Sequence, residues 1–209
     1  MQNQPGRMAL TDPLSDIELV QEVRNGKRQA YTELMRRYQK RVYWVARRIV
    51  GNHDDADDVV QETFVKAYLA LGDFRGEAGF FTWVYRIAVN LALNAVRKRQ
   101  VMNYLRESEL LSNLLPSPED PSAGVEAEEL DSAVRRAIDI LPEKQKAVFV
   151  LRYYEELSYE EIAVILKTSV GGLKANYFHA LRKVQDYLRN EIQAGQTHDR
   201  RGRGAVAPG

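Results

Sequence analysis

The sequence predicts an all-α protein built from two small helical domains joined by a flexible acidic linker. Apolar residues recur at spacings of three and four along most of the chain, which is the period of an amphipathic helix. Residues 107–131 break this pattern with eight acids, three prolines and no lysine or arginine. Such a segment cannot bury enough apolar surface to fold alone. We therefore expect a linker at 104–130 between domains at 14–103 and 131–194.

Two amphipathic helices are expected at the start of the first domain. Ser15 and Glu18 carry the signature of a capping box, and the helix that they open should stop near Gly26. A longer helix should follow and end around Gly51. Its core face combines six residues at spacings of three and four: Ala30, Leu34, Tyr38, Val42, Val45 and Ile49.

A third and a fourth helix complete the first domain. Aspartates between residues 54 and 58 suit the positive end of the third helix, and Gly72 should end it. A loop with Gly76 and Gly79 follows, and the basic residues 97–99 should close the fourth helix. The expected apolar stripes are Val60, Phe64, Ala67 and Leu71 in the third helix, and Val84, Ala88, Leu91 and Ala95 in the fourth.

The fourth helix also carries a polar face with an aromatic residue at one end. This face comprises Trp83, Arg86, Asn90, Asn94 and Arg97. One interpretation is a solvated face beside core aromatics, with cations that suit the helix C-terminus. The other is a surface for single-stranded nucleic acid, because aromatic rings stack on unpaired bases and arginines neutralise phosphates. The spacing alone leaves both interpretations open.

The second domain has the pattern of a helix-turn-helix. A helix should run from Leu141 to about Tyr154, and a capping box at Ser158 and Glu161 should open a short helix. Ser169 should cap the last helix. Its core stripe is Val170, Leu173, Tyr177, Leu181, Val184 and Leu188. The opposite face carries Lys174, Asn176, Phe178, His179, Arg182 and Lys183. Such a face can enter a DNA major groove, although an ordinary solvated surface fits the same pattern.

Composition excludes several classes of function. The chain has no cysteine, so disulfides and thiol chemistry are absent, and its three histidines are too scattered to suggest a metal cluster. The longest apolar run, residues 147–151, is far shorter than the roughly 20 residues of a membrane-spanning helix. No nucleophile triad or phosphate-binding glycine loop can be assembled, which disfavours an enzyme. We expect a cytoplasmic protein without cofactor, metal or membrane insertion, with disorder in residues 1–13 and 195–209.

Several stretches closely resemble the extracytoplasmic-function (ECF) sigma factors of the sigma-70 family, which serve bacterial RNA polymerase. Those that resemble region 2 of the family are residues 57–68 (DDVVQETFVKAY), 74–76 (FRG) and 82–90 (TWVYRIAVN). Those that resemble region 4 are residues 141–142 (LP) and 158–163 (SYEEIA), continuing to Arg182. The resemblance covers about residues 14–103 and 131–190, in the order that the family has.

The resemblance implies a transcription initiation factor that brings core RNA polymerase to promoter DNA and has no active site. The polymerase clamp would be bound by Asp57, Asp58, Gln61, Glu62 and Phe64. The minus-ten promoter element would be opened and held by Arg75, Phe80, Thr82, Trp83, Arg86, Asn90, Asn94 and Arg97. The minus-thirty-five element would be read by Lys174, Asn176, Phe178, His179, Arg182 and Lys183.

One stretch departs from the family's pattern. Many relatives carry Arg-Ser-Arg where this chain has residues 174–176 (KAN), and Gly172 stands where threonine is frequent. The loss of an arginine fork removes the strongest way to hold guanine, so we expect a different or less stringent upstream preference.

Family analogy also predicts an anti-sigma partner for the free chain, which we expect to be a monomer. The acidic linker would either pass through the RNA channel of the polymerase or serve as a solvated spacer. The alternative function is a stand-alone helix-turn-helix regulator that binds duplex DNA without polymerase.

Overall fold

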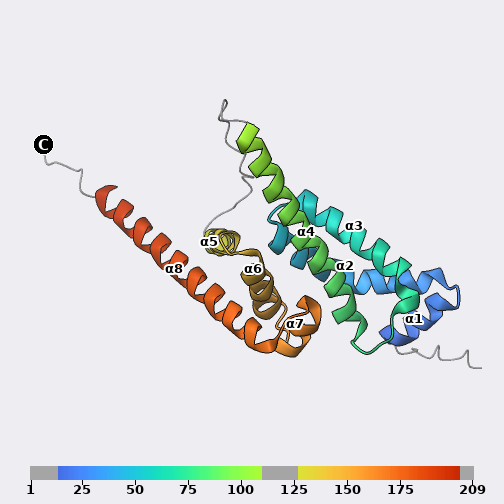
Figure 1. Cartoon of the computed structure of the whole chain (residues 1–209). Coiled ribbons are helices and arrows are strands. Elements are labelled where there is room, and N and C mark those ends of the chain that lie inside the picture. The colour runs from blue at the N-terminus through green and yellow to red at the C-terminus, as the bar shows by residue number, and fades with distance from the viewer. Residues whose placement is uncertain (1–13, 110–126, 203–209) are drawn as a thin grey trace, which may run out of the picture.

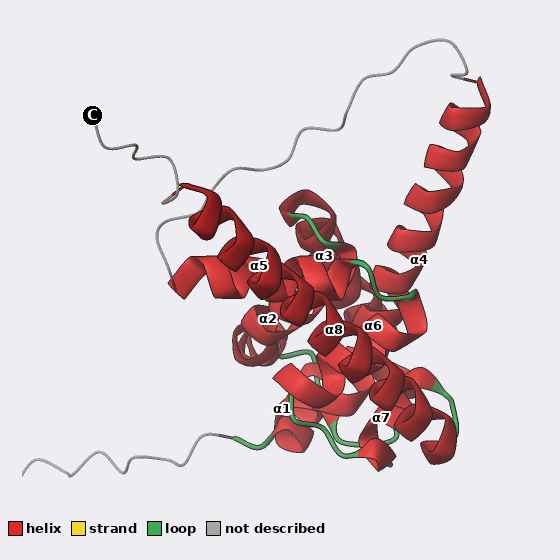
Figure 2. Cartoon of the chain, turned by 90° about the vertical axis from the view of Figure 1, so that its left-hand side faces the viewer, coloured by secondary structure: helices red, strands yellow, loops and turns green. Residues whose placement is uncertain are grey.

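A computed structural model describes residues 14–109 and 127–202 of the chain, with side chains described in 14–106 and 132–193. These residues form helices joined by short turns (Figures 1 and 2), which confirms the predicted all-α class. Within the described residues, no helix has the length and apolar composition that crossing a bilayer requires.

The first domain is a bundle in which α2, α3 and α4 pack on one another and α1 packs against α2. Its elements are α1 (Asp16–Arg24), α2 (Arg28–Val50), α3 (His53–Leu69), the short 3₁₀ helix η1 (Leu71–Asp73) and α4 (Phe80–Glu109). The predicted core face of α2 is confirmed, because Leu34, Val42, Val45 and Ile49 are fully buried. The predicted stripe of α4 is too narrow, because Tyr85, Val89, Ala92 and Val96 are buried along with Val84 and Ala88.

Local capping signals set the limits of most of these helices. The capping box at Ser15 is confirmed, and Gly51 ends α2 in the left-handed region at φ +88°, which disfavours any residue with a Cβ. The expectation for Gly72 is wrong. α3 already ends at Leu69, and Gly72 lies inside η1, because Ala70 caps α3 and the chain then tightens into a 3₁₀ turn.

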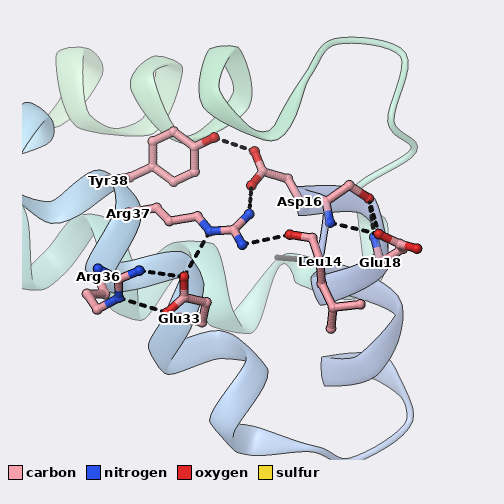
Figure 3. Close-up of polar contacts among 8 residues, drawn as sticks. Leu14, Asp16, Glu18, Glu33, Arg36, Arg37 and Tyr38 are labelled. Carbon is pink, nitrogen blue, oxygen red and sulfur yellow. Dashed lines mark hydrogen bonds and ion pairs between the residues drawn. The ribbon is translucent and has the colours of Figure 1, made fainter. Parts of the chain in front are cut away.

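Polar side chains fasten α1 to α2, as Figure 3 shows. The guanidinium of Arg37 donates to Asp16 at 2.9 Å, to Glu33 at 3.0 Å and to the carbonyl of Leu14 at 2.6 Å. The hydroxyl of Tyr38 donates to the other oxygen of Asp16. The ring of Tyr38 in turn lies against the aromatic rings at the start of α4. This network therefore connects α1 to the end of α4 that carries the candidate site.

The second domain contains the predicted helix-turn-helix. Its elements are α5 (Ala127–Asp139), α6 (Glu143–Phe149), the π-helix η2 (Val150–Tyr154), α7 (Tyr159–Leu166) and α8 (Val170–Gly202). The capping box at Ser158 is confirmed, and Ser169 accepts a hydrogen bond from the amide of Gly172 at 3.3 Å, as expected of a cap. Between α7 and α8, Lys167 adopts the left-handed conformation at φ 50° and turns the chain.

Helices extend further than the sequence predicted at three places. α4 continues beyond the basic residues 97–99 to Glu109, and α5 begins at Ala127, so both ends of the predicted linker are helical. No Gly or Pro lies between Gly79 and Pro116, so nothing in the chain stops α4 earlier. α8 runs through Gly195 to Gly202, because a single glycine costs a helix only about 1 kcal/mol. The middle of the linker and the expected disordered residues 1–13 lie outside the described residues.

The two domains pack directly on each other, although the sequence predicted a flexible linker between them. α7 lies against α4, and buried residues of both domains belong to one continuous apolar cluster. Ile162 and Ile165 of α7 contribute to it with no exposed surface. Aromatic and cationic groups extend the interface, since the guanidinium of Arg48 lies 4.0 Å from the ring centre of Tyr154.

Candidate nucleic-acid interface

The first turns of α4 combine a buried side and a half-exposed side. Phe80, Thr82 and Tyr85 are buried, whereas Trp83 and Arg86 are half-buried. Further along the same helix, Asn90, Asn94 and Arg97 are exposed. Of the predicted minus-ten residues, Phe80 lies inside the core, Thr82 is almost fully buried, and the rest have accessible surface. Burial of Phe80 and Thr82 fits a role in holding the shape of the site.

Trp83 packs against a cluster of aromatic rings. Its ring centre lies 5.2 Å from that of Phe74 in the preceding loop and 5.7 Å from that of Phe80. Phe80 also contacts Phe74 at 5.9 Å and Tyr38 of α2 at 5.5 Å. Because several rings fix it, the indole is held in one orientation at the surface.

A pocket of about 320 Å³ lies beside this cluster. It is lined by Asp73, Phe74, Arg75, Gly76, Glu77, Ala78, Thr82, Trp83, Arg86 and Val164. Trp83 offers an aromatic surface, and Arg75 and Arg86 offer guanidinium groups. These groups suit a flat, unstacked base joined to a phosphate. Val164 belongs to α7, so the second domain borders the pocket in this arrangement.

The far end of the polar face also meets the second domain. Arg97 donates from Nε to Glu143 of α6 at 2.8 Å and from Nη1 to Asn94 at 3.4 Å. Arg99 turns the other way, donating to Asp55 at 3.0 Å and to the carbonyl of Val50 at 2.6 Å. The predicted minus-ten residues therefore lie together along one helix and the loop before it. Among them, Arg97 is paired with the carboxylate of Glu143.

The exposed face of α3 carries the predicted polymerase contacts. Asp57, Asp58, Gln61 and Glu62 are exposed, and Lys66 pairs with Glu62 at 2.9 Å. Apolar residues continue the same face, because Val65 is 59% exposed and Leu69 is 77% exposed. Phe64 differs from the other predicted contacts. It is 3% exposed and packs in the core, where it supports α3 from inside.

The outer face of α8 carries the predicted minus-thirty-five contacts. Lys174, Phe178, His179, Arg182 and Lys183 are exposed, and Phe178 packs edge-on against His179 at 5.8 Å. Asn176 is half-buried, and its amide donates to the carbonyl of Gly172 at 2.9 Å. The inner face holds the helix in place through Leu173, Ala180 and Val184.

Shifted pKa values occur at structural contacts in both domains. Burial, and then the nearby charge of Glu155, raise the pKa of Tyr85 well above the ordinary value of a tyrosine. Hydrogen bonds from the side chain and backbone of Ser158 lower the pKa of Glu161. Within the described residues, no group of three or more acidic, histidine or cysteine side chains is arranged to hold a metal ion.

Sequence reasoning missed two groups around the site. Glu155 accepts hydrogen bonds from Tyr85 and Arg41 across the domain interface, and Arg24 of α1 donates to carbonyls of the loop after α3. Neither has a local pattern that could have revealed it, because the partners lie tens of residues apart in the chain.

Comparisons with known proteins agree with this organisation. Residues 34–101 match the model for Sigma-70 region 2, and residues 131–184 match the model for Sigma-70, region 4. The RNA polymerase sigma-H factor of Pseudomonas aeruginosa is 34% identical over 83% of this chain and 94% of its own length. The ECF RNA polymerase sigma-E factor of Haemophilus influenzae is 35% identical over 88% of this chain and 98% of its own length.

A solved structure is similar as well. The structure of CnrH in complex with the cytosolic domain of CnrY matches with a TM-score of 0.64 and 26% identity, over 84% of this chain and 97% of that one. The sequence matches extend across both domains in the same order. The chain therefore belongs to the ECF sigma factors of the sigma-70 family.

Proposed function

We propose that this chain directs bacterial RNA polymerase core to promoters by opening the minus-ten element with its first domain and reading the minus-thirty-five element with its second. The observation that carries this proposal is the pocket beside Trp83, with Arg75 and Arg86 at its edge. Stacking an unpaired base on an aromatic ring contributes about 1–3 kcal/mol, which offsets much of the few kcal/mol that unpairing costs. Strand opening then requires no hydrolysis by this chain, so we assign it no catalytic activity.

The exposed face of α3 is the proposed contact with the polymerase clamp. This face supplies carboxylates and an amide from Asp57, Asp58, Gln61 and Glu62. Val65 and Leu69 add exposed apolar surface, whose burial in an interface is favourable. Phe64 would act indirectly in this contact, since its ring is buried beneath the helix. An interface with an apolar centre and a polar rim is the usual composition of a stable protein contact.

The outer face of α8 is the proposed reader of the minus-thirty-five element. Lys174, Phe178, His179, Arg182 and Lys183 stand on a helix that follows a tight turn, which is how helix-turn-helix domains enter the major groove. The Asn176 amide donates to the carbonyl of Gly172, which leaves its second N–H and its oxygen available to a base. The absence of an arginine fork at residues 174–176 supports a different or less stringent upstream preference.

Control by a protein partner is part of the proposal. The solved structure of CnrH has the cytosolic domain of CnrY bound to it. By analogy, an anti-sigma factor would hold this chain in the cytoplasm until a signal releases it. The exposed Val65 and Leu69 of α3 are the apolar surface that such a partner would cover.

Binding to fork-junction DNA tests the minus-ten assignment. The polymerase holoenzyme is titrated against a promoter fragment whose minus-ten non-template strand is single-stranded, and against the same fragment as a full duplex. Arg86→Ala should weaken fork binding about tenfold and leave duplex binding nearly unchanged. Arg106→Ala, at the other end of α4, is the matched control and should affect neither.

Equal weakening on both templates would contradict the assignment of Arg86 to the opened strand. Tight binding of the chain to duplex DNA without any association with polymerase would instead support the stand-alone regulator.

A further inference from the structure

Arg24 connects the last turn of α1 to the loop that precedes α4. Its Nη2 donates to the carbonyl oxygen of Leu71 at 3.0 Å, to that of Gly72 at 3.2 Å and to that of Phe74. Its Nε donates to Leu71 as well, at 3.3 Å. The acceptors are all main-chain oxygens, so the guanidinium restrains the path of the backbone and not the position of a neighbouring side chain.

The loop has few other restraints. η1 comprises only three residues, and Arg75, Gly76 and Glu77 beyond it are exposed. A Cβ added at Gly72, Gly76 or Gly79 would meet nothing within 4 Å, so the loop is not packed against a neighbouring element at these points. Its position therefore depends mainly on three anchors, which are the guanidinium of Arg24 and the side chains of Leu71 and Phe74, 3% and 6% exposed.

The restrained loop forms one wall of the pocket at Trp83. Residues 73–78 line it from one side, and Thr82, Trp83 and Arg86 of α4 line it from the other. A shift of the loop would change the distance between Arg75 and Trp83, and hence the shape that an unstacked base must fit. A lysine could not replace the anchor, because its ammonium is a point donor, whereas the planar guanidinium reaches several carbonyls at once.

We infer that Arg24 is a positioning residue for recognition of the minus-ten element, acting through the backbone of residues 71–74 without touching the DNA. The inference rests on the proposed function, because it assumes that the pocket receives a promoter base. α1 is thereby part of the recognition machinery, although it lies at the other end of the domain's sequence.

Base preference in the opened strand is the measurement that distinguishes a positioning role of Arg24 from a general contribution to the stability of the fold. Holoenzyme made with wild-type chain, Arg24→Lys, Arg24→Ala or Arg28→Ala is bound to a library of fork-junction DNAs randomised across the minus-ten strand. Bound and free pools are sequenced, and thermal unfolding and affinity for core polymerase are measured in parallel. Arg28 is exposed at the start of α2 and provides an arginine control nearby.

Both Arg24 variants should lose about tenfold of the discrimination between preferred and rejected bases, equivalent to about 1.4 kcal/mol, because the loop no longer holds Arg75 in place beside Trp83. Affinity for core polymerase and the preference of Arg28→Ala should match wild type. Arg24→Lys keeps the positive charge, so a loss of base discrimination in this variant would exclude a purely electrostatic effect.

An Arg24→Lys holoenzyme with the wild-type base preference would overturn the inference. So would a loss of core binding as large as the loss of discrimination, because that would reveal a general structural role. A wild-type holoenzyme with no base preference at all would instead contradict the proposed function, and the two failures are therefore distinguishable.

Discussion

The hydroxyl of Tyr85 in α4 donates a hydrogen bond to Glu155 of the second domain at 2.8 Å, although the two residues lie 70 positions apart. Arg41 of α2 donates to the same carboxylate oxygen at 3.1 and 3.3 Å. Only 8% of the Glu155 side chain is exposed, so the two domains meet around a largely buried charge.

This packing has a geometric consequence for promoter binding. Val164 of α7 borders the same pocket as Trp83, so the helix-turn-helix lies beside the proposed minus-ten site. The minus-ten and minus-thirty-five elements are about 25 base pairs apart, or about 85 Å at roughly 3.4 Å per base pair. If the two domains hold these two elements as proposed, they must separate from this packed arrangement when the chain binds a promoter.

Glu155→Gln should loosen the contact between the domains. The amide can still accept from Tyr85, but the charge that holds Arg41 is lost, and a hydrogen bond to a charged group contributes about 1.5–3 kcal/mol. The chain has no cysteine, so Gln39→Cys and Asn190→Cys provide a unique pair of dye sites for energy transfer between the domains. Transfer in the free chain should fall, whereas the neighbouring exposed Glu156→Gln should leave it unchanged. Identical transfer in both variants would mean that Glu155 does not hold the domains together.

Trp83→Ala should impair promoter opening more than initial promoter binding. Its ring borders the pocket that would receive an unpaired base, and loss of stacking removes about 1–3 kcal/mol from the opened state only. Permanganate reactivity of the melted strand, compared with gel-shift affinity for the duplex, separates the two steps. Trp44→Ala removes the other tryptophan of the chain as a control and should leave opening intact. An equal loss in both steps would place Trp83 outside the opened complex.

Arg182→Ala should reduce the salt dependence of binding to minus-thirty-five duplex DNA. Each lost phosphate contact lowers the slope of log affinity against log salt by about 1. Arg189 lies on the same helix, pairs with Asp186 at 3.2 Å and gives the matched control Arg189→Ala. The slope of Arg182→Ala, measured over a series of salt concentrations, should differ from that of the control. Equal slopes would remove Arg182 from the DNA contact.

Acid should destabilise the fold over a defined range of pH. Hydrogen bonds from Arg36 and Arg37 lower the pKa of Glu33 from 4.5 to about 2, and bonds from Ser158 lower that of Glu161. A depressed folded pKa gives stability that is present above the unfolded value and is lost as pH falls toward the folded value. Urea unfolding should therefore show declining stability between about pH 4.5 and 2. Glu33→Gln should show a shallower decline, and a decline as steep as wild type would contradict the assignment.

Ser158→Ala should destabilise the helix-turn-helix by about 1 kcal/mol, because it removes the acceptor for the amide of Glu161. Urea unfolding followed by circular dichroism measures the change. Ser158→Thr keeps a hydroxyl at the cap and is expected to retain most of the stability. An alanine variant as stable as wild type would show that tertiary packing alone fixes the start of α7.

The parts of the fold that could be predicted from sequence depend on neighbouring residues. Ser15 with Glu18, and Ser158 with Glu161, are three residues apart, and each forms the capping box that its spacing predicts. Gly51 ends α2 because the left-handed conformation is local as well. The helix-turn-helix and the faces of α4 and α8 follow from the same short-range periodicity.

The parts that could not be predicted depend on partners distant in the chain. The contacts of Glu155 with Tyr85, and of Arg24 with Phe74, have no periodic signal, because only the tertiary fold brings these groups together. Burial of Phe64 agrees with the apolar stripe predicted for the third helix, whereas the position of Phe80 was left open, since an aromatic residue beside a polar face can point either way. The direct packing of α7 on α4 depends on apolar side chains of both helices. The charges of the linker contain no information about this contact.

Run-off transcription tests the central claim most directly. Purified core RNA polymerase and a supercoiled library of genomic promoters are incubated with and without this chain, and the starts of the transcripts are sequenced. We expect new, specific starts that share two upstream elements at a fixed spacing. Folded chain that neither associates with polymerase nor produces new starts would contradict it.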